Sequence, residues 1–375
     1  MVMRSNFKLL LLSFIIVVTT HAQNDKFPSL NIGDTAPPLR VRGWIKGAPV
    51  QRFEKGNVYV VEFWATWCKP CIAAMPHLSA LASEYKDKIT ILGINIYERK
   101  NTSMEKVKAF VDSMGQLMGY HVAAEDSNFM VAGWLDASGE QVEGIPRSFV
   151  VDAEGRVAWI GHPKELNQVL PQIVNNTWNI KSALTKRNLD KHLKKRDEEV
   201  NYQLIAYTGD TFKQDYLGKP DSALLVINEI IKTEPKLKYA PLIASHTFSS
   251  LLKTNLHKAY EYGKVMMVTP TYVDPAYNVI IDDIKWYSDK LNLSPEIYKL
   301  GAEAYEVKID QIPYPEIVNI SKYYNKMAEW YWRAKDKPKA IEAQQKAIEV
   351  LKAKKGFSET EMDVFKSRLK QYNNR

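Results

Sequence analysis

The 375-residue chain contains only two cysteines, Cys68 and Cys71, and no run of five like charges. Two cysteines can neither hold a disulfide-rich scaffold together nor form a four-cysteine zinc site within one chain. The 51 Lys and Arg residues are spread among 43 Asp and Glu residues, so the formal net charge of +8 is weak support for a nucleic-acid partner. Beyond residue 22, no segment approaches the roughly 18 uninterrupted apolar residues of a membrane helix. We therefore expect no nucleic-acid partner and no later membrane span.

Apolar residues make up 45% of the chain and charged residues 25%, which is the balance of an ordinary globular protein. This balance excludes a disordered chain and a collagen-like repeat. Because domains commonly contain roughly 100–200 residues, the length predicts two or three domains, each long enough to bury a core.

The N-terminus has the pattern of a secretory signal peptide over residues 1–22. Arg4 and Lys8 supply positive charge, Leu9–Val18 is almost wholly apolar, and Ala22 ends a small-residue cleavage pattern. An uncleaved N-terminal anchor is the alternative. We expect a periplasmic or otherwise extracytoplasmic protein with no membrane span after signal removal. Disulfides form and persist in that compartment.

Residues 23–176 mix short apolar runs with turns and helical periodicity. Runs rich in β-branched and aromatic residues predict strands, and apolar residues recurring every three or four positions predict helices. The order of these elements predicts an α/β domain, with a mixed sheet that has helices on both faces. The expected strands are 57–65, 89–96, 147–151 and 156–160, and the expected helices are 68–85, 104–118 and 163–174.

After residue 176 the hairpin signals disappear. Residues 177–201 are highly charged and predict an exposed linker or a helix, and residues 202–375 predict an all-α domain. Similar turns precede a set of positions at steps of 36, 39 and 42 residues, which are helix-pair distances. These positions are Ala223, Ala259, Tyr298 and Ala340. We expect a degenerate helical-repeat domain, and an irregular helical bundle is the alternative.

The two cysteines lie between a predicted buried strand and the first turn of a predicted helix. The free N–H groups of a helix N-terminus favour a thiolate, and Lys69 adds a positive charge beside it. Pro70 stiffens the turn and removes an N–H that the helix start leaves unpaired anyway. This context predicts a redox-active pair, with Cys68 the more exposed and more acidic thiol. A purely structural disulfide and half of an intermolecular metal site are the alternatives.

Two separated motifs resemble one known family. Residues 61–71 read V-E-F-W-A-T-W-C-K-P-C and are similar to the active-site segment of thioredoxin-fold proteins. The segment especially resembles that of the exported TlpA-like and ResA-like redoxin-type thiol–disulfide oxidoreductases. Residues 144–155 resemble the cis-proline loop and hairpin of that family. The resemblance covers about residues 27–176 and implies a thioredoxin-like fold there, while the unit at 330–347 resembles a tetratricopeptide motif.

The resemblance implies catalytic roles for three residues. Cys68 would be the attacking thiol and Cys71 the resolving thiol. Glu62 takes the position of the acid buried beneath the cysteine pair. A carboxyl in an apolar strand should have a raised pKa and could take the proton from Cys71 as it attacks. A solvated acid at the end of the strand is the alternative for Glu62.

The same resemblance implies a substrate-binding surface around the thiols. Pro146 would be cis, with the Ile145 carbonyl and the Arg147 amide flanking an extended substrate strand. Arg147 stands where many relatives have threonine, and its cation could favour acidic partner surfaces or alter the redox potential. The full set of expected substrate-binding residues is Trp67, Lys69, Pro70, Ile145, Pro146 and Arg147.

These expectations combine into an exported thiol–disulfide oxidoreductase with a C-terminal helical module. We expect no cofactor beyond the Cys68–Cys71 disulfide and no bound metal. The resemblance favours a reductant that acts on protein disulfides of the cell envelope and is recharged by an upstream thiol donor. The helical domain would hold a protein client or mediate self-association. Two alternatives are a binding module with a vestigial cysteine pair and a thiol peroxidase, although the usual Pro-x-x-x-Thr/Ser-x-x-Cys pattern of peroxidases is absent.

Overall fold

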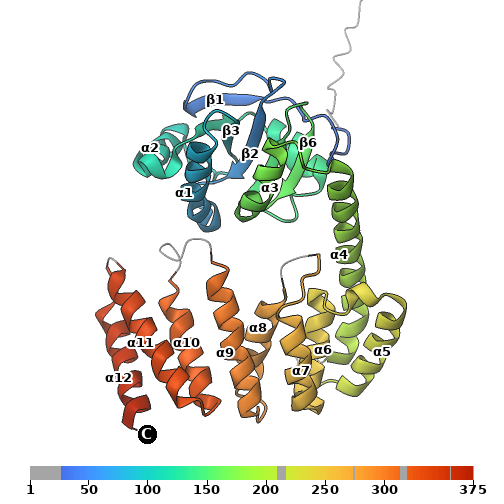
Figure 1. Cartoon of the computed structure of the whole chain (residues 1–375), viewed down its shortest axis with the longest axis vertical. Helices are drawn as coiled ribbons and strands as arrows, with labels where there is room; N and C mark the ends of the chain where they lie inside the picture. The colour runs from blue at the N-terminus through green and yellow to red at the C-terminus, as the bar shows by residue number, and fades with distance from the viewer. Residues whose placement is uncertain (1–26, 209–216, 273–274, 313–318, 355, 375) are drawn as a thin grey trace, which may run out of the picture.

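The structure, a computed structural model, describes residues 27–208, 217–272, 275–312, 319–354 and 356–374 (Figure 1). The expected signal peptide at residues 1–22 lies outside these ranges. A sheet domain and a helical domain are joined by the long helix α4 (Ile180–Thr208). Within the ranges described, every helix is too short or too polar to cross a membrane.

The sheet domain has six strands in the order β1-β4-β3-β2-β5-β6. The pairs β2–β3 and β3–β4 are parallel, and the pairs β1–β4, β2–β5 and β5–β6 are antiparallel. The predicted mixed sheet is therefore confirmed. Its strands are β1 (Val41–Lys46), β2 (Val58–Trp64), β3 (Ile89–Asn95), β4 (His121–Glu125), β5 (Arg147–Val151) and β6 (Val157–Gly161). The helical segments are α1 (Lys69–Glu84), α2 (Met104–Met114), a 3-10 turn (Gly115–Met118), a π-helix (Val131–Asp136), a second 3-10 turn (Pro163–Glu165) and α3 (Leu166–Val174).

Strand β2 lies in the middle of the sheet and is buried along its whole length. Because successive strand residues point to opposite faces, Val58 and Val60 join one apolar cluster, while Tyr59 and Val61 join another. The first cluster includes residues of α1, α2 and α3, and the second includes the π-helix. Helical segments cover both faces of the sheet, and the carboxyl end of β2 leads into the turn that precedes α1.

Helix α4 is shared by the two domains. Near its start, Ile180 and Leu184 pack against the second apolar cluster of the sheet domain. Further along, Val200 and Leu204 are buried in a separate cluster with helices of the C-terminal domain. The charged segment at 177–201 is therefore mostly helix, and its sparse apolar residues contribute to both cores.

The C-terminal domain is all helical, as predicted. Its helices pack mainly against their neighbours in sequence. Ala223, Ala259 and Ala340, three of the positions that follow the recurrent turns, have no exposed surface, which lets adjacent helices approach closely. The helices are α5 (Pro220–Thr233), α6 (Pro241–Thr254), α7 (Leu256–Met266), α8 (Tyr277–Tyr287), α9 (Pro295–Asp310), α10 (Ser321–Arg333), α11 (Lys337–Ala353) and α12 (Glu359–Asn374).

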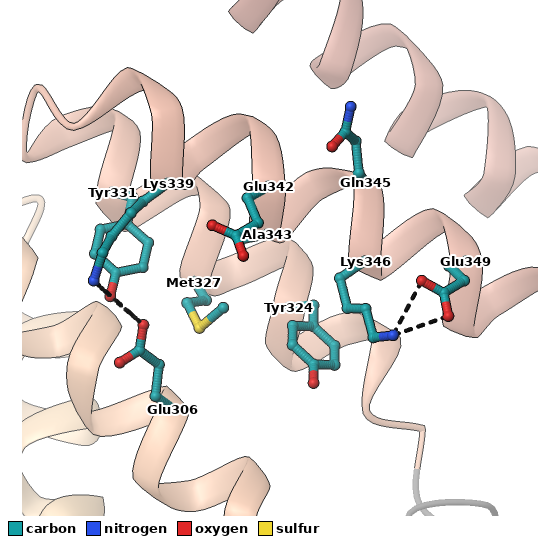
Figure 2. Close-up of a pocket in the computed structure, with 10 residues that line it drawn as sticks. All are labelled: Glu306, Tyr324, Met327, Tyr331, Lys339, Glu342, Ala343, Gln345, Lys346 and Glu349. Carbon is teal, nitrogen blue, oxygen red and sulfur yellow. Dashed lines mark hydrogen bonds and ion pairs between the residues drawn. The ribbon is translucent and has the colours of Figure 1, made fainter.

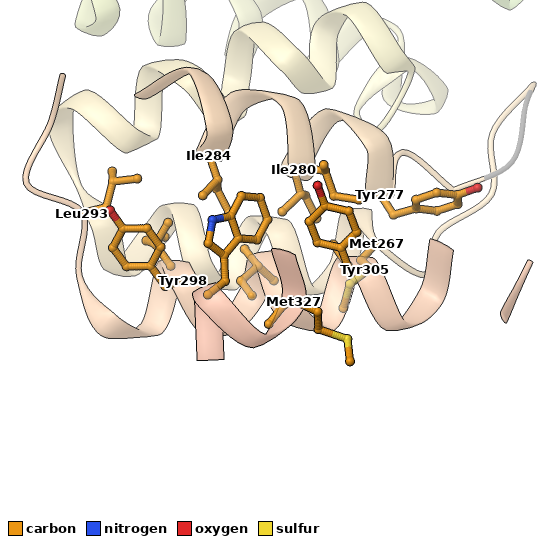
Figure 3. Close-up of a cluster of buried hydrophobic side chains, with 14 of the residues drawn as sticks. Met267, Tyr277, Ile280, Ile284, Leu293, Tyr298, Tyr305 and Met327 are labelled. Carbon is orange, nitrogen blue, oxygen red and sulfur yellow. The ribbon is translucent and has the colours of Figure 1, made fainter. Parts of the chain in front are cut away.

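One large apolar cluster holds the middle of this domain together, and Figure 3 shows part of it, with side chains from α8, α9 and α10. Gly301 on α9 permits a close approach, because a Cβ atom there would lie 2.5 Å from Cε3 of Trp330 on α10. The Trp330 ring is fully buried in consequence. Helix-to-helix packing of this kind gives the domain a core that is independent of the sheet.

Candidate active site

Cys68 and Cys71 form a disulfide at the start of α1. Cys68 is the N-cap of the helix, and the backbone N–H of Cys71 donates to its Sγ atom at 3.2 Å. Pro70 occupies the first turn, where its missing N–H costs no helical hydrogen bond. Cys68 and Cys71 are only 3% and 1% exposed, so the difference in exposure that the sequence predicted is small. An N–H directed at sulfur favours the thiolate form of Cys68 once the disulfide is reduced.

A loop distant in sequence lies against the disulfide. The peptide bond between Ile145 and Pro146 is cis, and the carbonyl oxygen of Ile145 lies 3.6 Å from Sγ of Cys68. Pro146 is buried and Ile145 is half-buried. The structure thus brings together the two motifs that the sequence analysis singled out.

The rim of the site contains the other expected substrate-binding residues of the first motif. Trp67 is 42% exposed, and Lys69 and Pro70 are also exposed. The indole Nε1–H of Trp67 donates to the carbonyl oxygen of Tyr97 at 2.8 Å, which fixes the ring beside the disulfide. Tyr97 is itself 39% exposed.

The turn before Cys68 depends on Glu98, a residue that the sequence analysis missed. Its carboxylate accepts hydrogen bonds from the backbone N–H of Thr66 at 2.7 Å and from the Thr66 hydroxyl at 2.8 Å. The side-chain amide of Asn95 donates to the same carboxylate at 2.8 Å. Glu98 therefore ties the end of β3 to the turn that presents Cys68. No local sequence pattern marks such a contact.

Glu62 is buried in β2, with 1% of its surface exposed, rather than solvated at the end of the strand. The hydroxyl of Ser148 on β5 donates to its Oε2 atom, and Oε1 has no hydrogen-bond partner among the described residues. Burial raises the pKa of the Glu62 carboxyl to about 8, although the Ser148 hydrogen bond and the Arg147 charge act in the opposite direction. A carboxyl of this kind can hold or release a proton near neutral pH.

The Arg147 side chain turns toward acidic groups of its own domain. Its Nε atom lies 3.1 Å from Glu140, and its Nη2 atom lies 3.7 Å from Glu143. The side chain is only 14% exposed. Its charge is thus paired within the chain, so the expectation that it faces acidic partner surfaces lacks support. The Arg147 backbone still begins β5, next to cis Pro146.

A separate groove of about 520 Å³ lies among α9, α10 and α11 in the helical domain (Figure 2). Its cations are already paired, because Lys346 lies 2.9 Å from Glu349 and Lys339 lies 3.8 Å from Glu306. The groove contains no cysteine and is remote in sequence from the disulfide. The thiol chemistry therefore belongs to the sheet domain.

Comparison with known proteins gives matches to the sheet domain. The model of the AhpC/TSA family matches residues 32–160. Protein FixW of Rhizobium leguminosarum is 32% identical over 154 residues, which are 40% of this chain and 69% of that protein. Thiol:disulfide interchange protein HelX of Rhodobacter capsulatus is 32% identical over 139 residues, which are 36% of this chain and 71% of that protein.

Among solved structures, a thiol:disulfide interchange protein from Chlorobium tepidum is 26% identical and aligns with 38% of this chain and 96% of its own, at a TM-score of 0.31. The matched family model ends before the helical domain begins. Because this chain is 32% identical to FixW and to HelX over more than two thirds of each of those proteins, it belongs to the redoxin-type, thioredoxin-fold family of thiol–disulfide oxidoreductases.

Proposed function

We propose that this oxidoreductase is exported and reduces disulfides of cell-envelope proteins through Cys68 and Cys71. The observation that carries the proposal is the disulfide at the start of α1, held against the Ile145–Pro146 loop. Export rests on the signal-peptide pattern at residues 1–22 and makes the protein periplasmic or otherwise extracytoplasmic. No cofactor beyond the disulfide and no metal ion enters this proposal.

The proposed reaction consists of two thiol exchanges. The Cys68 thiolate attacks one sulfur of a partner disulfide, and the other partner sulfur leaves as a thiolate. Cys71 then loses its proton and attacks Sγ of Cys68, which releases the second partner thiolate. The partner disulfide is thereby reduced to two thiols, and Cys68 and Cys71 are oxidised to a disulfide. An upstream thiol donor returns them to the reduced state.

Glu62 is proposed as the group that takes the proton of Cys71. Its buried position in β2 and its pKa of about 8 support this role, because a fraction of the carboxyl is ionised at neutral pH and that fraction can accept a proton. The unpaired Oε1 atom leaves one oxygen of the carboxyl free to accept it.

The proposed substrate strand lies along the cis-proline loop. The Ile145 carbonyl and the Arg147 amide would pair with its backbone, since Pro146 between them has no N–H of its own. Trp67 offers an exposed apolar surface, and Lys69 and Pro70 complete the rim. Backbone pairing of this kind accepts many sequences, as a reductant of several clients requires.

The helical domain is proposed to be tetratricopeptide-like and to hold a protein client or a second copy of the chain. Arrays of stacked helix pairs present extended surfaces for proteins. A chain shortened after Lys195 keeps the part of α4 that packs on the sheet domain. It should retain reduction of a small disulfide and lose either a native client or self-association, as measured by trapping and by sizing. Equal partners and equal mass for both chain lengths would contradict both roles.

Two cysteine variants test the thiol roles. Cys68→Ser should abolish reduction of insulin disulfides with the fold intact by circular dichroism. Cys71→Ser should accumulate mixed disulfides with partner proteins, because release needs the second thiol. Turnover of Cys71→Ser at the parent rate would show that the assigned roles are wrong.

The reduction potential of the pair decides the direction. We expect a value close to that of thioredoxin, about −270 mV, measured by equilibration with a thiol buffer. A value near the about −120 mV of strongly oxidising enzymes would make the protein a disulfide donor instead.

A further inference from the structure

Helix α4 holds the segment that leads into the cis-proline loop. The guanidinium of Arg187 on α4 donates to the Glu140 carboxylate at 2.6 Å and to the carbonyl oxygen of Ser138 at 3.0 Å. It also donates to the side chain of Asn31 at 3.1 Å. One turn later, the Lys191 ammonium donates to the same Ser138 carbonyl at 2.6 Å. Two cations of one helix thus converge on the stretch that precedes Pro146.

Glu140 links this helix to the residue next to the cis-proline. It is 4% exposed, and its two carboxylate oxygens contact different guanidinium groups. Oε1 accepts from Arg187, and Oε2 lies 3.1 Å from Nε of Arg147. A buried carboxylate that bridges two guanidiniums holds both in place, because each charge loses its partner if the other moves. The position of Arg147, and hence of the Pro146 peptide, is tied to α4 in this way.

A second bridge lies closer to the helical domain. Lys194 on α4 forms an ion pair with Glu143, which stands three residues before Pro146. Glu143 also lies 3.7 Å from Nη2 of Arg147. Both acids of the loop therefore have one partner on α4 and share Arg147 as the other.

The same helix is anchored in the helical domain immediately afterwards. Two residues beyond Lys194, Arg196 contacts Glu234 at 2.7 Å. The buried Asp197 then accepts hydrogen bonds from the backbone N–H groups of Leu242 and Ile243, both at 2.9 Å. These two N–H groups belong to the first turn of α6, so α4 caps that helix. From Arg187 to Asp197, each turn of α4 therefore contacts either the sheet domain or the helical domain.

We propose that α4 positions the cis-proline loop for substrate pairing, with Arg187 and Lys194 as positioning residues, so that the helical domain supports the redox site. This inference rests on the proposed use of that loop to pair with an extended substrate. Neither Arg187 nor Lys194 touches the reacting sulfur atoms. Both act through Glu140, Glu143 and Arg147.

The test measures mixed-disulfide formation in the full chain carrying Cys71→Ser, where the product of the first exchange persists. One probe is a short extended peptide whose single cysteine is in a mixed disulfide with 2-mercaptoethanol. The other probe is hydroxyethyl disulfide, which has the same leaving group and no peptide backbone. The ratio of the two rates reports the advantage that backbone pairing gives. It depends on one exchange step, so it is independent of the direction of net electron flow.

Arg187→Gln should lower this ratio by about tenfold, since misplacing a positioning group by a fraction of an ångström weakens only the transition states that depend on it. The rate with hydroxyethyl disulfide should stay within about twofold, because Cys68 itself is untouched. Lys186→Gln is the matched control: it removes the same charge from the same helix, but Lys186 is exposed and pairs with Asp190 within α4. Its ratio should equal that of the parent.

Lys194→Gln gives a milder test, because the Lys194 side chain is 34% exposed and its loss leaves little buried charge. It should lower the ratio in the same direction, and it decides the question if Arg187→Gln fails to fold by circular dichroism. Unchanged ratios in the folded variants would overturn the inference while leaving the proposed function intact. A parent ratio near one would mean that the loop gives no pairing advantage, which overturns the proposed pairing and the inference together.

Discussion

Two almost fully buried carboxyl groups, one in the sheet domain and one on α4 beside the helical domain, differ in the number of hydrogen bonds that they accept. Glu62 in the sheet domain and Asp197 in α4 are 1% and 0% exposed. Asp197 accepts two backbone N–H groups of α6 and the hydroxyl of Tyr272, at 2.7 to 2.9 Å. Glu62 accepts a single hydroxyl, that of Ser148, and keeps one oxygen without a hydrogen bond among the described residues.

The difference separates a structural carboxylate, Asp197, from Glu62, which is proposed to exchange a proton. Three donors offset part of the desolvation of Asp197, although burial still raises its pKa, and they fix the start of α6, so this group joins α4 to α6. With one donor, burial dominates at Glu62 and raises its pKa to about 8, where a proton can be exchanged at physiological pH. Burial alone therefore does not mark a catalytic acid. Glu62 and Asp197 differ in the number of hydrogen bonds that their carboxylate oxygens accept.

The largest expected effect is on stability at Asp197. Asp197→Ala should lower the free energy of unfolding by about 3 kcal/mol, because it leaves two buried backbone N–H groups without an acceptor. Chemical denaturation followed by circular dichroism measures it. Asp190→Ala is the matched control on the same helix, since it removes only an ion pair with Lys186 within α4 and should cost about 0.5 kcal/mol or less. Equal losses of stability at the two positions would mean that Asp197 does not fix α4 to the start of α6.

Glu62→Gln should affect the reaction more than the fold. It keeps the shape of the side chain and removes the proton acceptor, so attack of Cys71 on the mixed disulfide should slow by about a hundredfold near neutral pH. The first attack by Cys68 should change far less. Stopped-flow tryptophan fluorescence can separate the two steps. Glu54→Gln, at a carboxylate that is 54% exposed in the same domain, should leave both rates unchanged. Parent rates in Glu62→Gln would place proton transfer in water.

The pKa of Glu62 also predicts how stability varies with pH. The folded pKa of about 8 exceeds the ordinary value of 4.5, so the folded state binds the extra proton between these values. This contribution is complete below the ordinary value and is lost as the pH rises through about 8. The oxidised parent should therefore lose about 1 kcal/mol of stability per pH unit across that window, relative to Glu62→Gln. Parallel stability curves for the two proteins would contradict the raised pKa.

The smallest effects come from removing one hydroxyl donor from each carboxyl. Tyr272→Phe removes one of three donors from Asp197 and should cost about 1 kcal/mol of stability.

Ser148→Ala removes the hydrogen bond that lowers the pKa of Glu62, so that pKa should rise further. The pH profile of the resolving step should move upward with it. A downward movement would show that Ser148 stabilises the protonated form instead.

Much of the sheet domain could be predicted from sequence because its central strands are strongly apolar. The expected strands at 57–65 and 89–96 correspond to β2 and β3, and the expected helix at 68–85 corresponds to α1. The edge strand β1, with the sequence V-R-G-W-I-K, escaped prediction because charged residues and a glycine break its alternation. The alanine-rich β4 likewise lacks strand propensity of its own. Pairing with neighbouring strands, rather than local preference, makes both of them strands.

The site was only partly predictable for the same reason. The cysteine pair and the cis-proline are marked by short motifs, and Glu62 by the resemblance of residues 61–71 to the active-site segment of a known family. Glu98, in contrast, reaches the turn before Cys68 from the end of β3, and Glu140 meets Arg187 across 47 residues of sequence. No local pattern announces contacts between side chains so far apart. The charged composition of 177–201 predicted an exposed segment and gave no sign that Arg187 is buried against the loop.

Helix α4 contains 29 residues without an interruption, which makes it about 43 Å long. A flexible tether of the same number of residues would let the disulfide sample a wide range of distances from the helical domain. A rigid helix docked at both ends permits a narrow range. A client held by the helical domain would therefore be reduced only if its disulfide lies at the matching distance. The helix would then act as a gauge that selects clients by where their disulfides lie, whatever the sequence around the cysteines.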